Sequence, residues 1–395
     1  MRIVDLRFQR VRARWDYDGP LGEDRNIQPL DIYAEGRPTQ RNWPIPNLDA
    51  GPPYLVERFF LTVVTDAGVN GMYGPINGED VHIIRTQLAR HVIGEHPHAV
   101  ERIWDKLYRA MVAGRKGPTM TAISKIDLAL WDLKGKLLNA PVYELLGGPS
   151  RSQIRAYASM LGYSVEPERA AARAQELVAE GYTAMKWFFK YGPQDGQAGL
   201  RKNLALMEAL RAAVGPDVAL MFDAWKSWDV PYTQRMAALA AAVRPWWFEE
   251  PVMPDMIPQY AELRRTIPHV AIAGGEHEYT RWGMAALLDA GAVDILQPDP
   301  TWCGGLTEMV KICALASARG IPVIPHHGGV AASHLIAAQT LTTCPLQEWI
   351  IQAGRRDNLF LQHKIEPVQG YIDLPPGPGL SMVLDEDTIV EVEDC

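Results

Sequence analysis

The sequence predicts an α/β protein in which a (β/α)8 barrel, of the TIM type, follows a smaller α+β capping domain. After residue 150, short apolar runs alternate with alanine-rich amphipathic segments, which is typical of a parallel sheet with helices on both faces. Six successive apolar runs end in an acidic residue or a histidine. The spacing fits a barrel, because Asp223 and Glu348 are 125 residues apart over five units, and a barrel of about 250 residues allows about 31 per unit.

The first part of the chain predicts the strands of the capping domain. Residues 1–15 alternate apolar and polar side chains and predict one strand, and LVERFFLTVV at 55–64 predicts another before a hairpin turn. Residues 16–53 lack periodicity and are rich in Pro, Gly, Asp and Arg. A loop of this length is usually functional or disordered. We expect it to close over the barrel mouth together with AGRKGP at 113–118.

Helical periodicity follows these strands. Apolar residues recur with helical spacing and predict three helices, over 83–92, 100–111 and 120–138. The tail ends in the β-like TIVEVEDC, and we expect it to return to the capping domain. The expected organisation is therefore a capping domain, a barrel, and a tail that completes the cap, over residues 1–125, 126–358 and 359–395.

Eight apolar runs in the barrel region are interpreted as its strands. They occupy residues 154–160, 184–189, 218–224, 245–250, 270–275, 293–298, 321–325 and 346–350. Amphipathic segments between them predict helices, among them 167–179, 200–214, 232–243 and 306–319. Active sites of such barrels gather at the C-terminal ends of the strands, so the residues that end these runs are the candidates for a site.

The composition limits the classes of function. The chain has 395 residues, 47% of them hydrophobic and 22% charged, and its net charge of −8 argues against nucleic acid or an anionic membrane as the main partner. No apolar run is long enough to predict a membrane span, and the charged N-terminus lacks the apolar core of a signal peptide. The four cysteines show neither metal-ligand nor disulfide spacing. We therefore expect a cytoplasmic protein that binds a small molecule.

Carboxylates end three consecutive strands, at Asp223, Glu249 and Glu276. Like charges that lie close together repel one another, and burial increases the cost. Each residue alone would more often be a helix cap or a solvated loop residue, but repetition on three strands favours a bound cation. Ligands that are all oxygen suit a hard octahedral ion, Mg²⁺ first and Mn²⁺ second.

The other strand ends offer acid–base groups. His326 ends the seventh strand and Asp299 the sixth, and a neighbouring carboxylate can fix the tautomer of an imidazole and raise its pKa, which makes a general base. His327 is a rival, but strand alternation would point it away from the mouth. Glu348 on the eighth strand could, if protonated, donate a hydrogen bond to a developing oxyanion; a salt bridge at the rim is its alternative role. Lys186 ends the second strand at the same mouth.

The same residues carry a resemblance to a known family. Asp223, Glu249 in FEEP, Glu276 in GGE, Asp299 in QPD and His326 in PHH follow the order found in the mandelate racemase group of the enolase superfamily. IDLALWDLKGK and PVYELLGG resemble the helix and linker that lead into that family's barrel. Within the group, the chain most resembles acid-sugar dehydratases of the L-rhamnonate dehydratase type, through YGPQDGQAGLRKN, FDAWKSWDV, GEHE and QPDPTWCGGLTE.

The resemblance implies a role for each of these residues. Asp223, Glu249 and Glu276 would bind Mg²⁺, and His326 would be the base with Asp299 as its partner. The family's cap is an N-terminal α+β domain completed by the C-terminal tail, which matches the expected organisation. Relatives are commonly oligomers, so the resemblance also implies a homo-oligomer.

A departure from the family pattern bears on the reaction. Lys186 matches the first lysine of a Lys-x-Lys pair, but the second position is Phe188. A racemase needs a base on each face of the reacting carbon, whereas a dehydratase needs one base and an acid for the leaving hydroxyl. One histidine can do both if the elimination is syn. The resemblance therefore favours dehydration of an aldonate, a rhamnonate-like hexonate or a pentonate, to a 2-keto-3-deoxy acid, with Glu348 as hydrogen-bond donor to the enediolate.

Two alternatives stay open at this point. A racemase or epimerase could use Lys186 or Lys190 as its second base, and a non-catalytic sensor could keep the same scaffold. Substrate contacts are expected from the barrel and from the long loop, at Lys186, His277, Trp302, Glu348, Arg37, Arg41 and Trp43.

Overall fold

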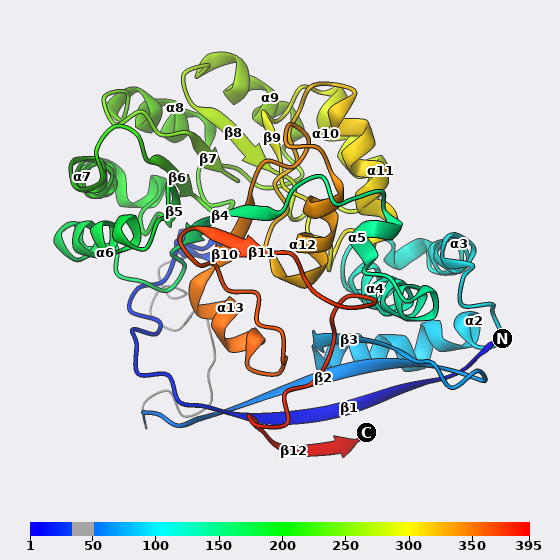
Figure 1. Ribbon diagram of the computed structural model, residues 1–395. Helices are drawn as coiled ribbons and strands as arrows, with labels where there is room; N and C mark the ends of the chain where they lie inside the picture. The colour runs from blue at the N-terminus through cyan, green and yellow to red at the C-terminus, as the bar shows by residue number, and fades with distance from the viewer. Residues whose placement is uncertain (34–50) are drawn as a thin grey trace.

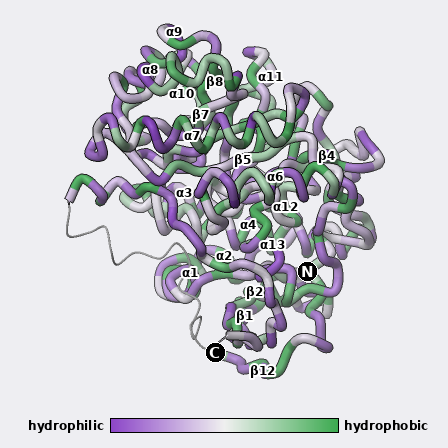
Figure 2. The backbone as a smooth tube through the Cα atoms, turned by 90° about the vertical axis from the view of Figure 1, so that its left-hand side faces the viewer, coloured by the Kyte–Doolittle hydropathy of each residue, from purple (hydrophilic) through white to green (hydrophobic). Residues whose placement is uncertain are grey.

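The computed structural model describes residues 1–33 and 51–395. It contains a small antiparallel sheet and a larger, mostly parallel sheet that curls into a barrel, with helices around it (Figure 1). Both chain termini lie at the end of the molecule that holds the small sheet, in the view of Figure 1 and in that of Figure 2. The predicted combination of a barrel and an α+β cap is therefore confirmed.

The small sheet joins the two ends of the chain. Alternation in β1 buries Val11, Ala13 and Trp15 on one face, and Val11 lies opposite Val392 in an antiparallel pairing. The tail therefore returns to the cap, as predicted. The sheet has the order β12-β1-β2-β3 and consists of β1 (Ile3–Trp15), β2 (Tyr54–Thr65), β3 (Gly71–Ile76) and β12 (Ile389–Asp394).

Helix α4 (Pro118–Leu138) links the cap to the barrel, because it packs against β2 and β3 and also against the barrel helix α11 (Gly305–Ser317). The expected domain boundary at residue 125 falls inside this helix, and the domain limits stay predictions. The predicted helix over 83–92 is interrupted by a turn with wider, π-type hydrogen bonding. The cap helices are α1 (Gly78–Ile83), the π-helical turn Ile84–Leu88, α2 (Ala89–Val92) and α3 (Val100–Ala110).

The barrel strands are parallel neighbours in the order β10-β4-β5-β6-β7-β8-β9. Each lies within or beside a predicted apolar run. They are β4 (Gln153–Ser159), β5 (Ala184–Phe188), β6 (Ala219–Asp223), β7 (Trp247–Glu249), β8 (Ala271–Gly274), β9 (Ile295–Leu296) and β10 (Gln347–Ile350). A short strand from the tail, β11 (Tyr371–Asp373), pairs antiparallel with β4.

The predicted strand at 321–325 is reduced to a single bridge. Val323 pairs in parallel with Leu296, and Pro322 and Pro325 lack the N–H donors that a longer ladder would need. The segment still completes the barrel wall. The inner layer takes one buried side chain from each of the predicted strand segments or its immediate flank: Tyr157, Ala184, Met221, Trp247, Ala273, Ile295, Ile324 and Leu346.

The predicted helices of the barrel are confirmed with small shifts of their ends. The helices are α5 (Val142–Leu145), α6 (Pro167–Ala179), α7 (Gly196–Val214), α8 (Val230–Leu239), α9 (Ile257–Thr266), α10 (Thr280–Asp289), α12 (Gly329–Ala338) and α13 (Ile351–Asn358). Across residues 1–33 and 51–395, no helix combines the length and apolarity that crossing a membrane requires.

The described start of the loop between β1 and β2 reaches the barrel. Glu23 N donates to Gly162 O at 2.8 Å, and Ile27 N donates to Phe189 O at 2.8 Å. These carbonyls follow the C-terminal ends of β4 and β5, and Ile27 is fully buried. This part of the loop therefore lies beside the barrel mouth, in line with the prediction.

Candidate active site

Three carboxylates meet at the C-terminal ends of adjacent barrel strands. Asp223 ends β6 and Glu249 ends β7, and the two residues are paired in register. Glu276 follows the last residue of β8 by two positions. Glu249 and Glu276 are buried, and Asp223 is half-buried. The structure therefore places the three predicted metal ligands at one mouth.

The electrostatics of these carboxylates favour a cation. Burial raises the pKa of Asp223 well above its ordinary value, and the charges of Glu249 and Glu276 raise it further. Burial also raises the pKa of Glu249, against the opposing effect of Lys186. A divalent ion would relieve this repulsion, and a donor set of oxygens alone suits Mg²⁺. The residues present therefore fit the expected metal.

In this arrangement Lys186 supplies positive charge at the site. Its ammonium pairs with Glu249 and, at 2.7 Å, with Glu348. Burial favours the neutral amine, but the two carboxylates outweigh it and raise the pKa of Lys186 well above its ordinary value. Lys186 is therefore a firmly held cation. Within the described residues, two sets of three ligand atoms lie within 4.8 Å of one another, Glu250–Glu276–His277 and Asp299–His326–His327. The predicted trio Asp223, Glu249 and Glu276 is not one of these sets, and its role as the metal site stays a prediction.

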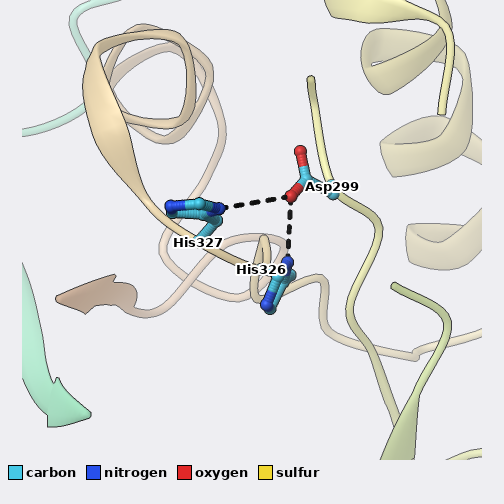
Figure 3. A group of neighbouring side chains, drawn as sticks. All are labelled: Asp299, His326 and His327. Atoms are coloured by element: carbon cyan, nitrogen blue, oxygen red, sulfur yellow. Dashed lines mark hydrogen bonds and ion pairs between the residues drawn. The ribbon is translucent and has the colours of Figure 1, made fainter. Parts of the chain in front are cut away.

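His326 and Asp299 form the predicted pair (Figure 3). The imidazole Nδ1 lies 2.9 Å from Asp299 Oδ2, and Asp299 Oδ1 accepts a hydrogen bond from Thr301 N at 2.6 Å. Burial lowers the pKa of His326, but the charge of Glu276 and the hydrogen bond to Asp299 raise it more, to about 10. Burial raises the pKa of Asp299, and the contact with His326 reverses this so that the net shift is downward.

His327 also lies beside Asp299, with 3.9 Å between its Nδ1 and Asp299 Oδ2, and Figure 3 shows the two imidazoles on different sides of the carboxylate. Its φ is 68°, so the backbone is left-handed rather than extended. The expectation from strand alternation that His327 points away was therefore wrong in its premise, since this segment does not continue as a strand.

Glu348 lies on β10 and is fully buried. Its Oε2 accepts a hydrogen bond from His327 N at 2.8 Å. Burial raises the pKa of Glu348, but Lys186 and His326 lower it to about 2. The carboxylate is therefore ionised in this arrangement and accepts hydrogen bonds. Its predicted role as a donor needs a proton and stays a prediction.

A second group of polar side chains links Lys226, His277 and Glu250. His277 Nδ1 lies 2.9 Å from Glu250 Oε2, and Lys226 Nζ lies 2.8 Å from His277 Nε2. Trp302 lies near both His277 and His326, with its ring centroid 5.6 Å from that of His277 and 5.1 Å from that of His326. The predicted contacts His277 and Trp302 are thus brought together with His326.

Sequence reasoning missed Lys226 and Glu250. Both have positive φ, 65° and 39°, so alternation along a strand does not predict where their side chains point. The signals were weak: a second glutamate directly after Glu249 and a lysine three residues after Asp223.

A cavity of about 220 Å³ lies between the cap and the barrel. Its lining includes Pro118, the last residue of the predicted AGRKGP segment, and Lys116 of that segment pairs with Glu278 at 2.7 Å. This segment therefore reaches the mouth, whereas Arg37, Arg41 and Trp43 lie outside the described residues. The barrel contributes His277, Tyr279 and Trp302 to the lining, and the cap contributes Asn77, Glu79, Asp80, Pro118 and Thr121.

Comparison with known families places both parts of the chain. Residues 56–147 match the N-terminal domain of the mandelate racemase / muconate lactonizing enzyme family, and residues 169–388 match the enolase C-terminal domain-like family. An L-rhamnonate dehydratase from Saccharopolyspora erythraea is 40% identical over 332 residues, which cover 82% of this chain and 80% of that protein.

Solved structures resemble the chain along nearly its whole length. The L-rhamnonate dehydratase of Gibberella zeae is 30% identical with a TM-score of 0.82, and the match covers 98% of this chain and 94% of that one. The rhamnonate dehydratase of the same organism complexed with Mg is 28% identical with a TM-score of 0.80 and the same coverage. The similarity therefore includes the cap as well as the barrel.

Proposed function

The chain belongs to the mandelate racemase / muconate lactonizing enzyme group of the enolase superfamily, and on this basis we propose that it is a Mg²⁺-dependent sugar-acid dehydratase. It is an enzyme of the hydro-lyase class rather than a non-catalytic sensor. The substrate is an aldonate, a rhamnonate-like hexonate or a pentonate. The observation that carries the proposal is the His326–Asp299 pair beside the three carboxylates.

Asp223, Glu249 and Glu276 are the residues that would hold Mg²⁺. When bound, the ion supplies positive charge to the substrate's carboxylate and makes the α-proton more acidic. The charge of Glu276 raises the pKa of His326, so offsetting that charge also favours the neutral imidazole that a base requires.

His326 is the base. Because Nδ1 is directed at Asp299, Nε2 is the nitrogen available to the substrate, and it lies 3.4 Å from Glu276 Oε2. Asp299 thus keeps the proton on Nδ1 and leaves a lone pair on the side of the carboxylates. This orientation points the accepting atom to where the substrate's α-carbon is expected.

The elimination moves one proton. His326 accepts the α-proton as the Cα–H bond breaks, and the resulting imidazolium donates it to the 3-hydroxyl, which leaves as water when the C–O bond breaks. A carbon–carbon double bond forms between C2 and C3, and the enol tautomerises to a 2-keto-3-deoxy acid as its hydroxyl loses a proton and C3 gains one. One residue can perform both transfers if both bonds lie on the same face.

An epimerase would need a second base, and its two lysine candidates are poorly suited to that role because both are paired with carboxylates. The pKa of Lys186 is raised by its two carboxylate partners, which opposes proton abstraction at neutral pH. Lys190 pairs with Asp24 at 2.5 Å, on the loop segment beside the mouth. Dehydration is therefore the better supported reaction.

A panel of aldonates that starts with L-rhamnonate and includes other hexonates and pentonates tests the proposal. Purified enzyme with Mg²⁺ is expected to form a 2-keto acid from at least one of them, and EDTA is expected to stop the reaction until Mg²⁺ is restored in excess. Exchange of the α-proton for deuterium in D₂O without loss of water would instead indicate an epimerase.

A further inference from the structure

We propose that Lys226 binds the carboxylate of the sugar-acid substrate. The inference rests on the proposed function and adds a substrate-binding cation to the site. Lys226 follows Asp223 by three residues, and its partner His277 directly follows Glu276. Lys226 and His277 are therefore close in sequence to Asp223 and Glu276, the carboxylates at which the acid group of the substrate is expected.

Lys226 is a buried lysine whose close partners carry no negative charge. The residue is only 8% exposed. Its Nζ lies 2.8 Å from His277 Nε2 and 3.6 Å from the centroid of the Trp225 ring. No carboxylate oxygen of residues 1–33 or 51–395 lies within 4.0 Å of it. Buried charges in proteins are almost always paired, so an anion is expected to complete this site.

The position of the ammonium is fixed from two sides. His277 Nδ1 is directed at Glu250 Oε2 at 2.9 Å, so Nε2 is free to accept a hydrogen bond from Lys226. The backbone is held as well, because Lys226 N donates to Glu250 O at 2.6 Å.

Trp225 and Lys226 have φ values of 41° and 65°. Two successive left-handed residues other than glycine are strained, and such strain persists where surrounding contacts hold it, often at functional sites.

The charge balance favours a carboxylate over a hydroxyl as the ligand. A sugar acid carries a single negative charge, at its carboxylate. Lys186, a second buried lysine at this mouth, is already paired with Glu249 and Glu348. A third, Lys125, donates to Thr301 O at 2.9 Å. Among the described residues, the close partners of Lys226 are instead an imidazole and an indole. Its partner His277 lines the cavity between the cap and the barrel, so the ammonium lies one side chain away from the space that a substrate can enter.

Equilibrium binding separates this role from catalysis. The affinity of an aldonate that the wild type turns over is measured by calorimetry with saturating Mg²⁺, in a His326→Asn background that prevents turnover. Adding Lys226→Met is expected to raise the Kd about ten- to hundredfold, as the loss of a hydrogen bond to a charged group does. Lys226→Arg is expected to recover part of the affinity, because the cation is restored.

Lys202→Met is the matched control. Lys202 is exposed and also lies over an aromatic ring, 4.8 Å from the centroid of Tyr191, so its loss is expected to leave the Kd unchanged. The Mg²⁺ affinity, titrated separately, is expected to be the same in all variants. If Lys226→Met does not fold, Lys226→Gln takes its place.

Lactate tests which end of the substrate Lys226 binds. It is a three-carbon 2-hydroxy acid, so it has the carboxylate of an aldonate but lacks the further hydroxyls. If Lys226 binds the carboxylate, the variant weakens lactate and the aldonate in parallel. A loss confined to the aldonate, or an unchanged Kd for both while the wild type turns the aldonate over, would overturn this inference and leave the proposed function intact. A wild type that turns over no aldonate would overturn the proposed function and this inference with it.

Discussion

At the scale of single residues, Asp299 determines which nitrogen of His326 acts. It accepts from Nδ1 at 2.9 Å and is itself held by Thr301 N. In an Asp299→Asn variant, the amide can donate to Nδ1 and place the imidazole proton on Nε2, the wrong nitrogen. We expect kcat to fall by about 10²–10⁴-fold, the usual contribution of acid–base catalysis.

Steady-state kinetics check this prediction, with Mg²⁺ affinity measured in parallel and expected to be unchanged. Asp289→Asn is the control, because it removes only an exposed pair with Arg319 and should keep the kcat of the wild type. An Asp299→Asn enzyme with wild-type kcat would show that the pair does not control the reaction.

The candidate site was predictable from sequence where a strand sets the position of a side chain. Asp223 and Glu249 end adjacent parallel strands, so their convergence follows from the fold class alone. The side-chain positions of Lys226 and Glu250 were not predictable, since both residues have a left-handed backbone just past a strand end. A salt bridge was named as an alternative role of Glu348, but its partner Lys186 was not predicted, because the contact joins side chains on strands far apart in the chain.

At the scale of elements, His334 holds helix α12 against α5. It is fully buried, and its Nδ1 accepts a hydrogen bond from Tyr143 N at 3.2 Å. An imidazole that accepts at Nδ1 and has no exposure is neutral. Burial lowers the pKa of His334 to about 3, well below its ordinary value of about 6.5.

This difference predicts how stability depends on pH. Between about pH 6.5 and pH 3 the unfolded chain binds a proton at His334 and the folded chain does not. The contribution of the neutral imidazole to the free energy of unfolding is therefore complete above about pH 6.5 and is lost as the pH falls. The loss approaches about 1.4 kcal/mol per pH unit. Urea unfolding at pH 7, 6 and 5 should show a shallower pH dependence for His334→Gln than for the wild type. The exposed His82→Gln variant is the control and should keep the pH dependence of the wild type. A His334→Gln variant with the same pH dependence as the wild type and this control would refute the assignment of a neutral, buried His334.

Among the elements, the barrel strands and their helices were predictable because apolar runs and helical spacing repeat regularly. The segment 321–325 was predicted as a strand but forms only one bridge, since prolines remove the donors that a ladder needs. The π-helical turn Ile84–Leu88 was missed because its side chains keep helical spacing.

At the scale of the molecule, Asp132 on α4 ties three parts of the chain together. Its buried carboxylate accepts from Met72 N at 2.7 Å and from Leu380 N at 2.9 Å, and pairs with Lys136 at 2.6 Å. It thus connects the cap sheet, the linking helix and the C-terminal tail. The return of the tail was predictable from its β-like composition. This junction was not, because the sequence does not show which backbone N–H groups donate to a buried carboxylate.

Asp132→Ala should therefore destabilise the whole fold. Two backbone N–H groups lose their acceptor, at about 1–3 kcal/mol each, so we expect a loss of roughly 2–6 kcal/mol in the free energy of unfolding. Chemical denaturation measures it. Asp105→Ala, which removes an exposed helical pair with Arg109, should cost about 0.5 kcal/mol or less. Similar losses for the two variants would contradict the account of this junction.

The central claim is that His326 removes the α-proton of a sugar acid at a Mg²⁺-loaded site. The rate of 2-keto acid formation by wild type and His326→Asn tests it most directly, with both proteins first shown by calorimetry to bind Mg²⁺ equally. We expect the wild type to convert at least one aldonate and the variant to lose about 10²–10⁴-fold or more of that rate. Undiminished dehydration by the variant would contradict it.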